Sequence, residues 1–143
     1  MAVIKNALFV VVGFVLGSVV NMALLAGGSA LIPAPQGVDV NDAESIANSI
    51  HLFEAKHFVF PFLAHAVGTL FGALVAGYLG WKNRVVLVWC VAVLFFAGGV
   101  ATTFMIPAPV TYIAVDLTLA FAPMAVLALW ALNNLLSKSR GSG

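Results

Sequence analysis

Residues 58–80 read FVFPFLAHAVGTLFGALVAGYLG, a run in which His65 is the only side chain that takes up charge near neutral pH. A helix of about 20 apolar residues is long enough to cross the hydrocarbon core of a bilayer. The run therefore predicts a transmembrane helix. An ionisable group inside such a helix is costly and normally has a function, so His65 requires an explanation.

Three further apolar stretches of similar length occupy residues 7–32, 85–106 and 113–132. The chain of 143 residues is 63% hydrophobic and 8% charged, and its mean hydropathy is +1.12. Charged residues make up about a quarter of an average soluble domain, so this composition predicts an integral membrane protein in a lipid bilayer. We expect an all-α fold, a four-helix transmembrane bundle that forms one domain over residues 1–137. The net charge of +1 gives no reason to expect a nucleic-acid partner.

Cationic residues collect on one side of the four predicted spans. They precede the first span, lie between the second and third, or follow the fourth: Lys5, Lys82, Arg84, Lys138 and Arg140. The segment between the first two spans carries four carboxylates and one cation: Asp39, Asp42, Glu44, Glu54 and Lys56. Lys and Arg are enriched in cytoplasmic loops, so both termini are expected in the cytoplasm of a bacterial inner-membrane protein. Residues 138–143 form a short cytoplasmic tail, and its final GSG is typical of a cloning remnant.

The segment over residues 33–57 is the one long connection. After a turn-forming stretch, NDAESIANSIHLFEAKHF at residues 41–58 predicts an amphipathic helix outside the cytoplasm. Asn41 is the expected N-cap, with Glu44 three residues later as in a capping box. Apolar residues recur at helical spacing and give one apolar face: Ile46, Ile50 and Phe53.

The two halves of the chain share a pattern. LIPAP at residues 31–35 and MIPAP at residues 105–109 end the first and third spans, and a glycine pair precedes each. Glu54 precedes Pro61 by seven residues, as Asp116 precedes Pro123. The pattern predicts two helical hairpins related by an axis along the membrane normal, as in some transporters. It would make Glu54 and Asp116 equivalent positions of similar depth; a chance match of proline-rich turns is the alternative.

The candidate site is a polar face near the outer side. With about 100° per residue, a helix that continues through Pro61 places His51, Glu54, His57 and His65 on one face. Asp116 is the expected partner from the second half of the chain. Thr102 and Thr103 are further candidates on the third span.

Three interpretations of this polar face remain open. Glu54, His57, His65 and Asp116 would suit a divalent transition metal such as Zn, Fe, Cu or Ni, or a small polar ligand. His65 and Asp116 would alternatively relay protons or ions, because imidazole titrates near neutral pH. In the third interpretation the polar groups only order the bundle of a structural or accessory subunit. A membrane enzyme acting on a lipid or quinone would need the amphipathic helix to gate a lateral pocket, and only one acid–histidine set is available for it.

Small residues form two GxxxG motifs, Gly13 with Gly17 and Gly68 with Gly72. Such motifs let helices approach closely, either inside the bundle or in a homo-oligomer or a complex with another membrane protein. Asn21 is expected to form a hydrogen bond between helices.

The stretch from IPAPQGVD through HLFEAKHFVFPFLAHAVGTLFGALVAG resembles a group of small four-span inner-membrane proteins of bacteria. The resemblance covers about residues 10–130. It implies a location in the membrane and a topology, and it implies no mechanism.

Overall fold

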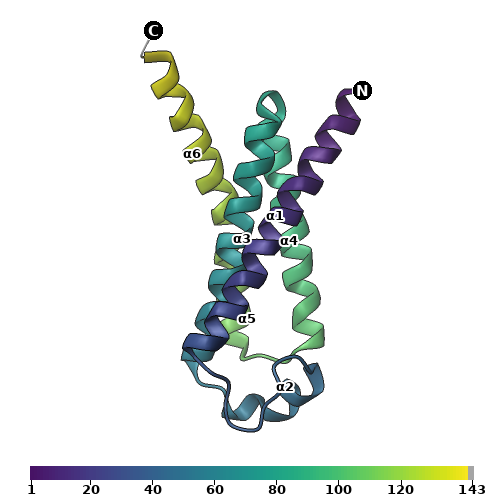
Figure 1. Cartoon of the computed structure of the whole chain (residues 1–143), viewed down its shortest axis with the longest axis vertical. Helices are drawn as coiled ribbons and strands as arrows, with labels where there is room; N and C mark the ends of the chain where they lie inside the picture. The colour runs from purple at the N-terminus through teal and green to yellow at the C-terminus, as the bar shows by residue number, and fades with distance from the viewer. Residues whose placement is uncertain (142–143) are drawn as a thin grey trace.

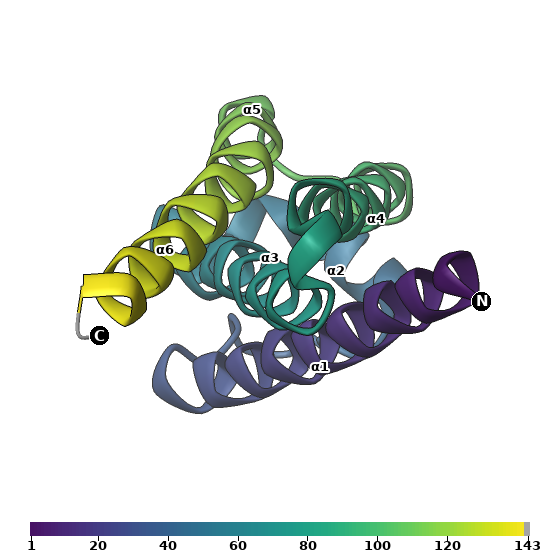
Figure 2. The same ribbon diagram turned by 90° about the horizontal axis from the view of Figure 1, so that it is seen from above.

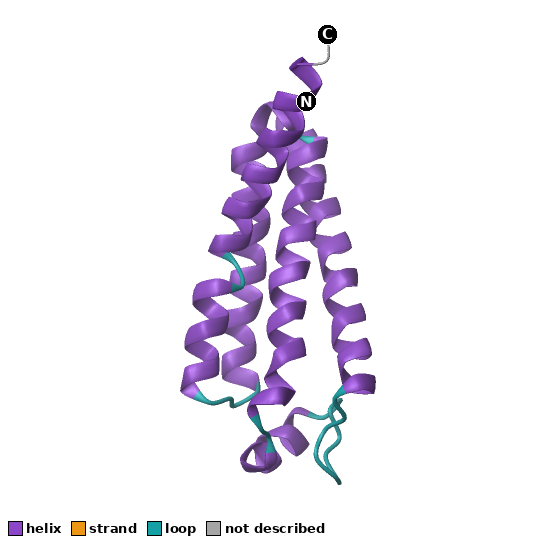
Figure 3. Cartoon of the chain, turned by 90° about the vertical axis from the view of Figure 1, so that its left-hand side faces the viewer, coloured by secondary structure: helices purple, strands orange, loops and turns teal. Residues whose placement is uncertain are grey.

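The computed structural model describes residues 1–141, with side chains described up to Leu135. The backbone over this range is helical apart from turns and short connections (Figure 3). Four segments in it are long and apolar enough to cross a membrane: Ala2–Leu31, Ala55–Leu79, Trp81–Met105 and Val110–Leu135. The chain is therefore an integral membrane protein built from four packed candidate spans, as the hydropathy predicts.

The first three spans contain one long helix each: α1 (Ala2–Leu31), α3 (Val59–Leu79) and α4 (Arg84–Met105). α3 lies at the centre of the bundle and contacts α1, α4 and α6 (Figure 2). Both ends of the chain lie at one end of the bundle, together with the turn between α3 and α4 (Figure 1). We call this the terminal end, and we call the opposite end, which carries residues 32–58, the loop end.

The fourth span is broken, which the prediction of one helix over residues 113–132 missed. It consists of α5 (Val110–Leu119) and α6 (Ala122–Gly141), and the break is visible in Figure 3. Pro123 explains the break, because proline has no N–H and its ring clashes with the carbonyl four residues earlier. Starting a new helix at Ala122 places Pro123 in a first turn, where the N–H groups have no intrahelical partner in any case. Because α6 runs to Gly141, the helix extends into the expected tail; the side chains of Lys138 and Arg140 and residues 142–143 lie outside the described part.

The connection over residues 32–58 contains three short helices instead of the single one expected. They are α2 (Ala43–Ser49) and the 3-10 turns Ile50–Leu52 and Ala55–Phe58, with extended backbone at Phe53 and Glu54 between them. The N-cap of α2 is Asp42, whose carboxylate accepts a hydrogen bond from the Glu44 N–H at 3.0 Å. The expected cap, Asn41, instead donates its N–H to the Asp39 carboxylate at 2.9 Å.

Both glycine motifs are used inside the bundle, where α1 packs against α3. A Cβ placed on Gly13 would lie 2.5 Å from the carbonyl oxygen of Gly72, and one on Gly17 would lie 2.5 Å from that of Gly68. The two backbones therefore touch, as small residues permit. These motifs are buried within one chain and do not offer a face to a second copy.

The rest of the core is apolar and centres on α3, α4 and α6. Its most buried members include Ala73, Ala76, Val88, Val91, Phe121, Ala125 and Leu132. At the terminal end, Arg84 donates from Nε and a terminal nitrogen to the Asn133 side chain, at 3.0 and 2.9 Å, and so joins α4 to α6. Asn21 lies against Gly68, but its amide forms no hydrogen bond to the described residues, contrary to expectation.

Candidate ligand cavity

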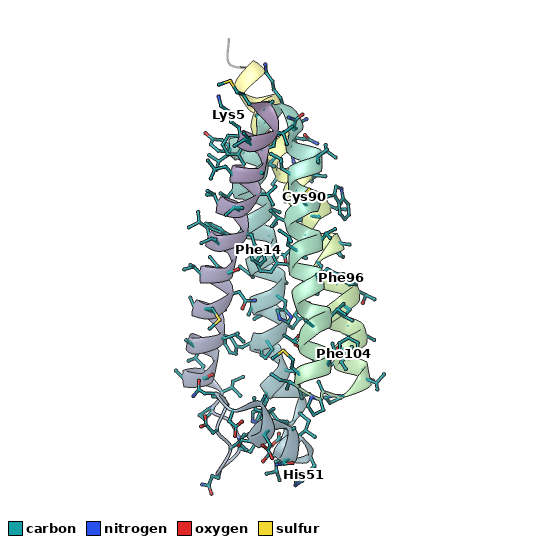
Figure 4. The ribbon with its side chains drawn as sticks, turned by 90° about the vertical axis from the view of Figure 1, so that its right-hand side faces the viewer. Lys5, Phe14, His51, Cys90, Phe96 and Phe104 are labelled. Carbon is teal, nitrogen blue, oxygen red and sulfur yellow. The ribbon has the colours of Figure 1, made fainter. Side chains whose placement is uncertain are left out.

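A cavity of about 460 Å³ lies at the loop end, between α1, α3, α4 and α5 and beneath α2. In Figure 4, the label His51 marks the loop end, and the label Lys5 marks the opposite, terminal end. The apolar face predicted for residues 41–58 forms part of the wall, because Ile46, Ile50 and Phe53 all line the cavity. Most of the other lining residues are apolar as well, including Met22, Leu25, Ile32, Phe58, Phe60, Ile106 and Ile113. The cavity is therefore shaped for apolar groups.

His65 and Asp116 form the buried polar pair of this cavity, and both line it. Nδ1 of His65 lies 2.8 Å from Oδ2 and 3.0 Å from Oδ1 of Asp116. The His65 side chain is 19% exposed and the Asp116 side chain 5%. The predicted contact between the two halves of the chain is confirmed at this position.

The second ring nitrogen of His65, Nε2, forms no hydrogen bond to the described residues. The ring lies against Phe121, with 5.6 Å between ring centroids, and Nδ1 is taken by Asp116. His65 is part of the cavity wall, and Nε2 is the nitrogen of its ring that Asp116 leaves unbonded.

Tyr112, which is not among the site residues predicted from the sequence, adds a second polar group to the wall. It lies one helical turn before Asp116 on α5 and lines the same cavity. Its ring packs on Phe58, with 4.8 Å between centroids. The (i, i+4) spacing to Asp116 is the signal that could have identified it, since such positions share a helix face.

Thr102 and Thr103 also line the cavity, as expected, but their hydroxyls are already used. Thr102 donates to the Gly99 carbonyl at 2.7 Å and Thr103 to the Val100 carbonyl at 2.8 Å. Because these hydroxyls already donate to carbonyls of their own helix, they do not offer their hydrogen to a ligand in the cavity.

Glu54 and His57 do not join His65 and Asp116. Nδ1 of His57 accepts the Glu54 N–H at 2.9 Å, which caps the 3-10 turn at Ala55–Phe58. The Glu54 carboxylate is 68% exposed and pairs with Lys56 at 3.1 Å. His57 lines the cavity, whereas Glu54 faces the shallower surface next to Pro33 and Pro35.

The expectation of one continuous polar face is therefore wrong. The extended backbone at Phe53 and Glu54 interrupts the helix, so that His51 lies exposed at the loop end (Figure 4) and, unlike His65, does not line the cavity. The expected equivalence of Glu54 and Asp116 fails as well, because Glu54 is an exposed cap and Asp116 is buried. Whether the two hairpins are a true repeat stays a prediction.

No group of three His, Cys, Asp or Glu residues that could hold a metal ion occurs within the described part of the chain. A divalent transition metal in a protein is normally held by three or four such ligands. The four residues suggested as metal ligands are divided between a buried pair and an exposed cap. This geometry offers no metal site of the kind that the sequence suggested.

The chain has no match among protein-family models, curated proteins or solved structures. The resemblance to small four-span bacterial proteins is thus supported only as far as the four candidate spans. The function of the chain has to be inferred from its own geometry.

Proposed function

We propose that this protein binds a lipid-soluble small molecule in the loop-end cavity, with the polar group of the ligand at His65. The observation that carries the proposal is a largely apolar cavity of about 460 Å³ with one buried His–Asp pair in its wall. Ligand pockets commonly have about this volume, and they combine apolar walls with a few well-placed polar groups. A ligand reaching this cavity from the bilayer would need an apolar body.

Two other interpretations find less support. A proton path needs a chain of polar groups, and the described residues provide only one more buried polar side chain, Thr69, one turn after His65 on α3. Beyond Thr69, towards the terminal end, the core is apolar, with Ala73, Ala76 and Leu132 at 0–1% exposure. The accessory-subunit interpretation explains the packing of the bundle but gives no role to the cavity.

We place the cavity on the extracytoplasmic side of a bacterial inner membrane. Lys5, Lys82 and Arg84 belong to the terminal end, and the acidic residues of the 32–58 connection belong to the loop end. Cytoplasmic loops carry an excess of Lys and Arg, which supports a topology with both termini in the cytoplasm.

Cysteine labelling in intact cells tests this orientation. With the exposed Cys90 replaced by Ala, Gln36→Cys at the loop end should react with a membrane-impermeant maleimide. Asn83→Cys at the α3–α4 turn should react only after the membrane is permeabilised. The reverse pattern would place the cavity on the cytoplasmic side.

Filling the cavity tests the proposal itself. The probe is para-decylacetophenone, whose binding to the purified protein in mild detergent is measured by calorimetry. Ala108→Trp adds an indole to the cavity wall and should abolish binding. Ala101→Trp is the matched control, because Ala101 is exposed and does not line the cavity, and it should bind as the wild type does. If wild type and Ala108→Trp bind the probe equally, the cavity is not the site.

A further inference from the structure

We infer that the cavity selects a lipid-soluble ligand whose polar group is an uncharged hydrogen-bond acceptor, such as a ketone or quinone carbonyl, which accepts a hydrogen bond from Nε2–H of His65. This inference rests on the proposed function and names the chemical class of the ligand.

Among the side chains that the structure describes, no cation balances Asp116 apart from its own histidine partner. None of the described residues that line the cavity is Lys or Arg; its ionisable members are His57, His65, Tyr112 and Asp116. Nδ1 of His57 lies 2.9 Å from the Glu54 backbone nitrogen, in the cap of the turn at Ala55–Phe58, and His57 forms no ion pair with Asp116. Lys56, the cation nearest to His65 along the chain, pairs with the exposed Glu54.

A negative charge without a partner is very costly in an apolar, buried setting. If His65 were neutral beside an ionised Asp116, the pair would carry such a charge. One added proton removes it, and the pair then exists either as imidazolium with carboxylate or as imidazole with carboxylic acid.

Both arrangements of the neutral pair leave a proton on Nε2. In the ion pair, both ring nitrogens carry protons. In the uncharged form, the carboxylic acid donates to Nδ1, so the ring proton must be on Nε2. Because Asp116 holds Nδ1 at 2.8 Å, Nε2–H of the neutral pair is the donor that remains for a ligand.

This donor determines which ligands fit. A carbonyl oxygen satisfies Nε2–H and adds no charge. A carboxylate or phosphate would bring a negative charge next to Asp116 into a cavity whose described lining residues include no Lys or Arg. A pure hydrocarbon would fill the space but leave a buried donor without a partner, which costs binding free energy.

Three probes with the same apolar body test the assignment: para-decylacetophenone, decylbenzene and para-decylbenzoate. The ketone should bind about tenfold more tightly than the hydrocarbon, the difference that one hydrogen bond to a buried polar pair provides. The benzoate should bind more weakly than the ketone. In infrared spectra the carbonyl band of the bound ketone should move to lower frequency, as expected for a hydrogen-bonded carbonyl.

Two variants separate the donor from the fold. His65→Asn retains an amide N–H near the position of Nδ1 for Asp116 but lacks Nε2, so it should lose the preference for the ketone and the infrared shift. Thr118→Val, the control outside the cavity, should keep both, because the Thr118 hydroxyl is exposed and bonded to its own helix. Thermal unfolding of each variant shows whether it is folded, and the infrared shift in the wild type stands independently of any variant.

The outcomes distinguish the two proposals. If the hydrocarbon or the benzoate binds as tightly as the ketone, or if the bound carbonyl is not shifted, the inference is overturned while the cavity remains a ligand site. If none of the three probes binds, the proposed function itself fails.

Discussion

Asp116 is the one carboxylate buried within the described part of the bundle, and 3% of the surface of the whole residue is exposed. Its side chain is held by His65, and no other hydrogen bond to it occurs among the described residues. When one member of a buried ionisable pair is removed, the other is left as a buried polar group without a partner. Replacing both members by apolar residues leaves no such group. The pair should therefore behave as a unit when it is mutated.

A double-mutant cycle measures this coupling. Asp116→Leu alone should lower the free energy of unfolding by about 1–3 kcal/mol, because Nδ1 of His65 then has no partner. His65→Leu combined with Asp116→Leu should cost less than the sum of the two single changes. The measurement is reversible unfolding in mixed micelles, with Thr118→Ala as the control, since the Thr118 hydroxyl is exposed and bonded to its own helix. Additive losses would mean that the two residues do not act as a pair.

The contact between His65 and Asp116 could be predicted from the sequence because the spans offer few other polar groups to either residue. The capping role of Glu54 and His57 could not be predicted from the sequence. Their capping geometry depends on extended backbone at Phe53 and Glu54, which no strong breaker residue marks. Tyr112 could be found only by asking what else shares the helix face of Asp116.

At the scale of the elements, α1 is held to α3 by glycines that leave no room for a side chain. A Cβ on Gly17 would lie 2.5 Å from the Gly68 carbonyl oxygen and 2.9 Å from the Phe95 ring. Since the clash with Gly68 involves backbone, it cannot be relieved by rotating a side chain. The two helices would have to move apart.

Gly17→Ala should therefore destabilise the fold by about 1–3 kcal/mol, the range for overpacking of a tight interface. Gly27→Ala is the matched control on the same helix, because nothing lies within 4 Å of a Cβ at Gly27. That change should leave stability unchanged or raise it by up to about 1 kcal/mol, as alanine favours helix over glycine. Equal effects of the two substitutions in mixed-micelle unfolding would refute the close α1–α3 contact.

Hydropathy was a good guide to the spans, because lipid demands a continuous apolar stretch of a set length. It located α3 and α4 closely, with predicted ranges 58–80 and 85–106. It could not reveal the break between α5 and α6, because apolar residues continue across it. The position of Pro123 carried that information, since a proline fits best in the first turn of a helix.

On the scale of the whole molecule, the two ends of the bundle have different roles. At the terminal end, α3, α4 and α6 are held together by apolar packing and by the bonds from Arg84 to Asn133. The loop end holds the cavity, roofed by residues of the 32–58 connection. The sequence predicted an apolar face on this connection but not the space beneath it, because the cavity depends on how four helices and the connection meet.

Photolabelling with para-decylbenzophenone tests the central claim, that a lipid-soluble ligand occupies this cavity, most directly. The ketone body matches the inferred ligand class, and on irradiation it attaches to whatever surrounds it. Mass spectrometry of the labelled wild-type protein should place the label on cavity residues such as Met22, Ile50 and Ile113, and excess para-decylacetophenone or Ala108→Trp should suppress it. Labels spread over bilayer-facing residues such as Val86 and Trp130, unaffected by competitor or by Ala108→Trp, would contradict the account.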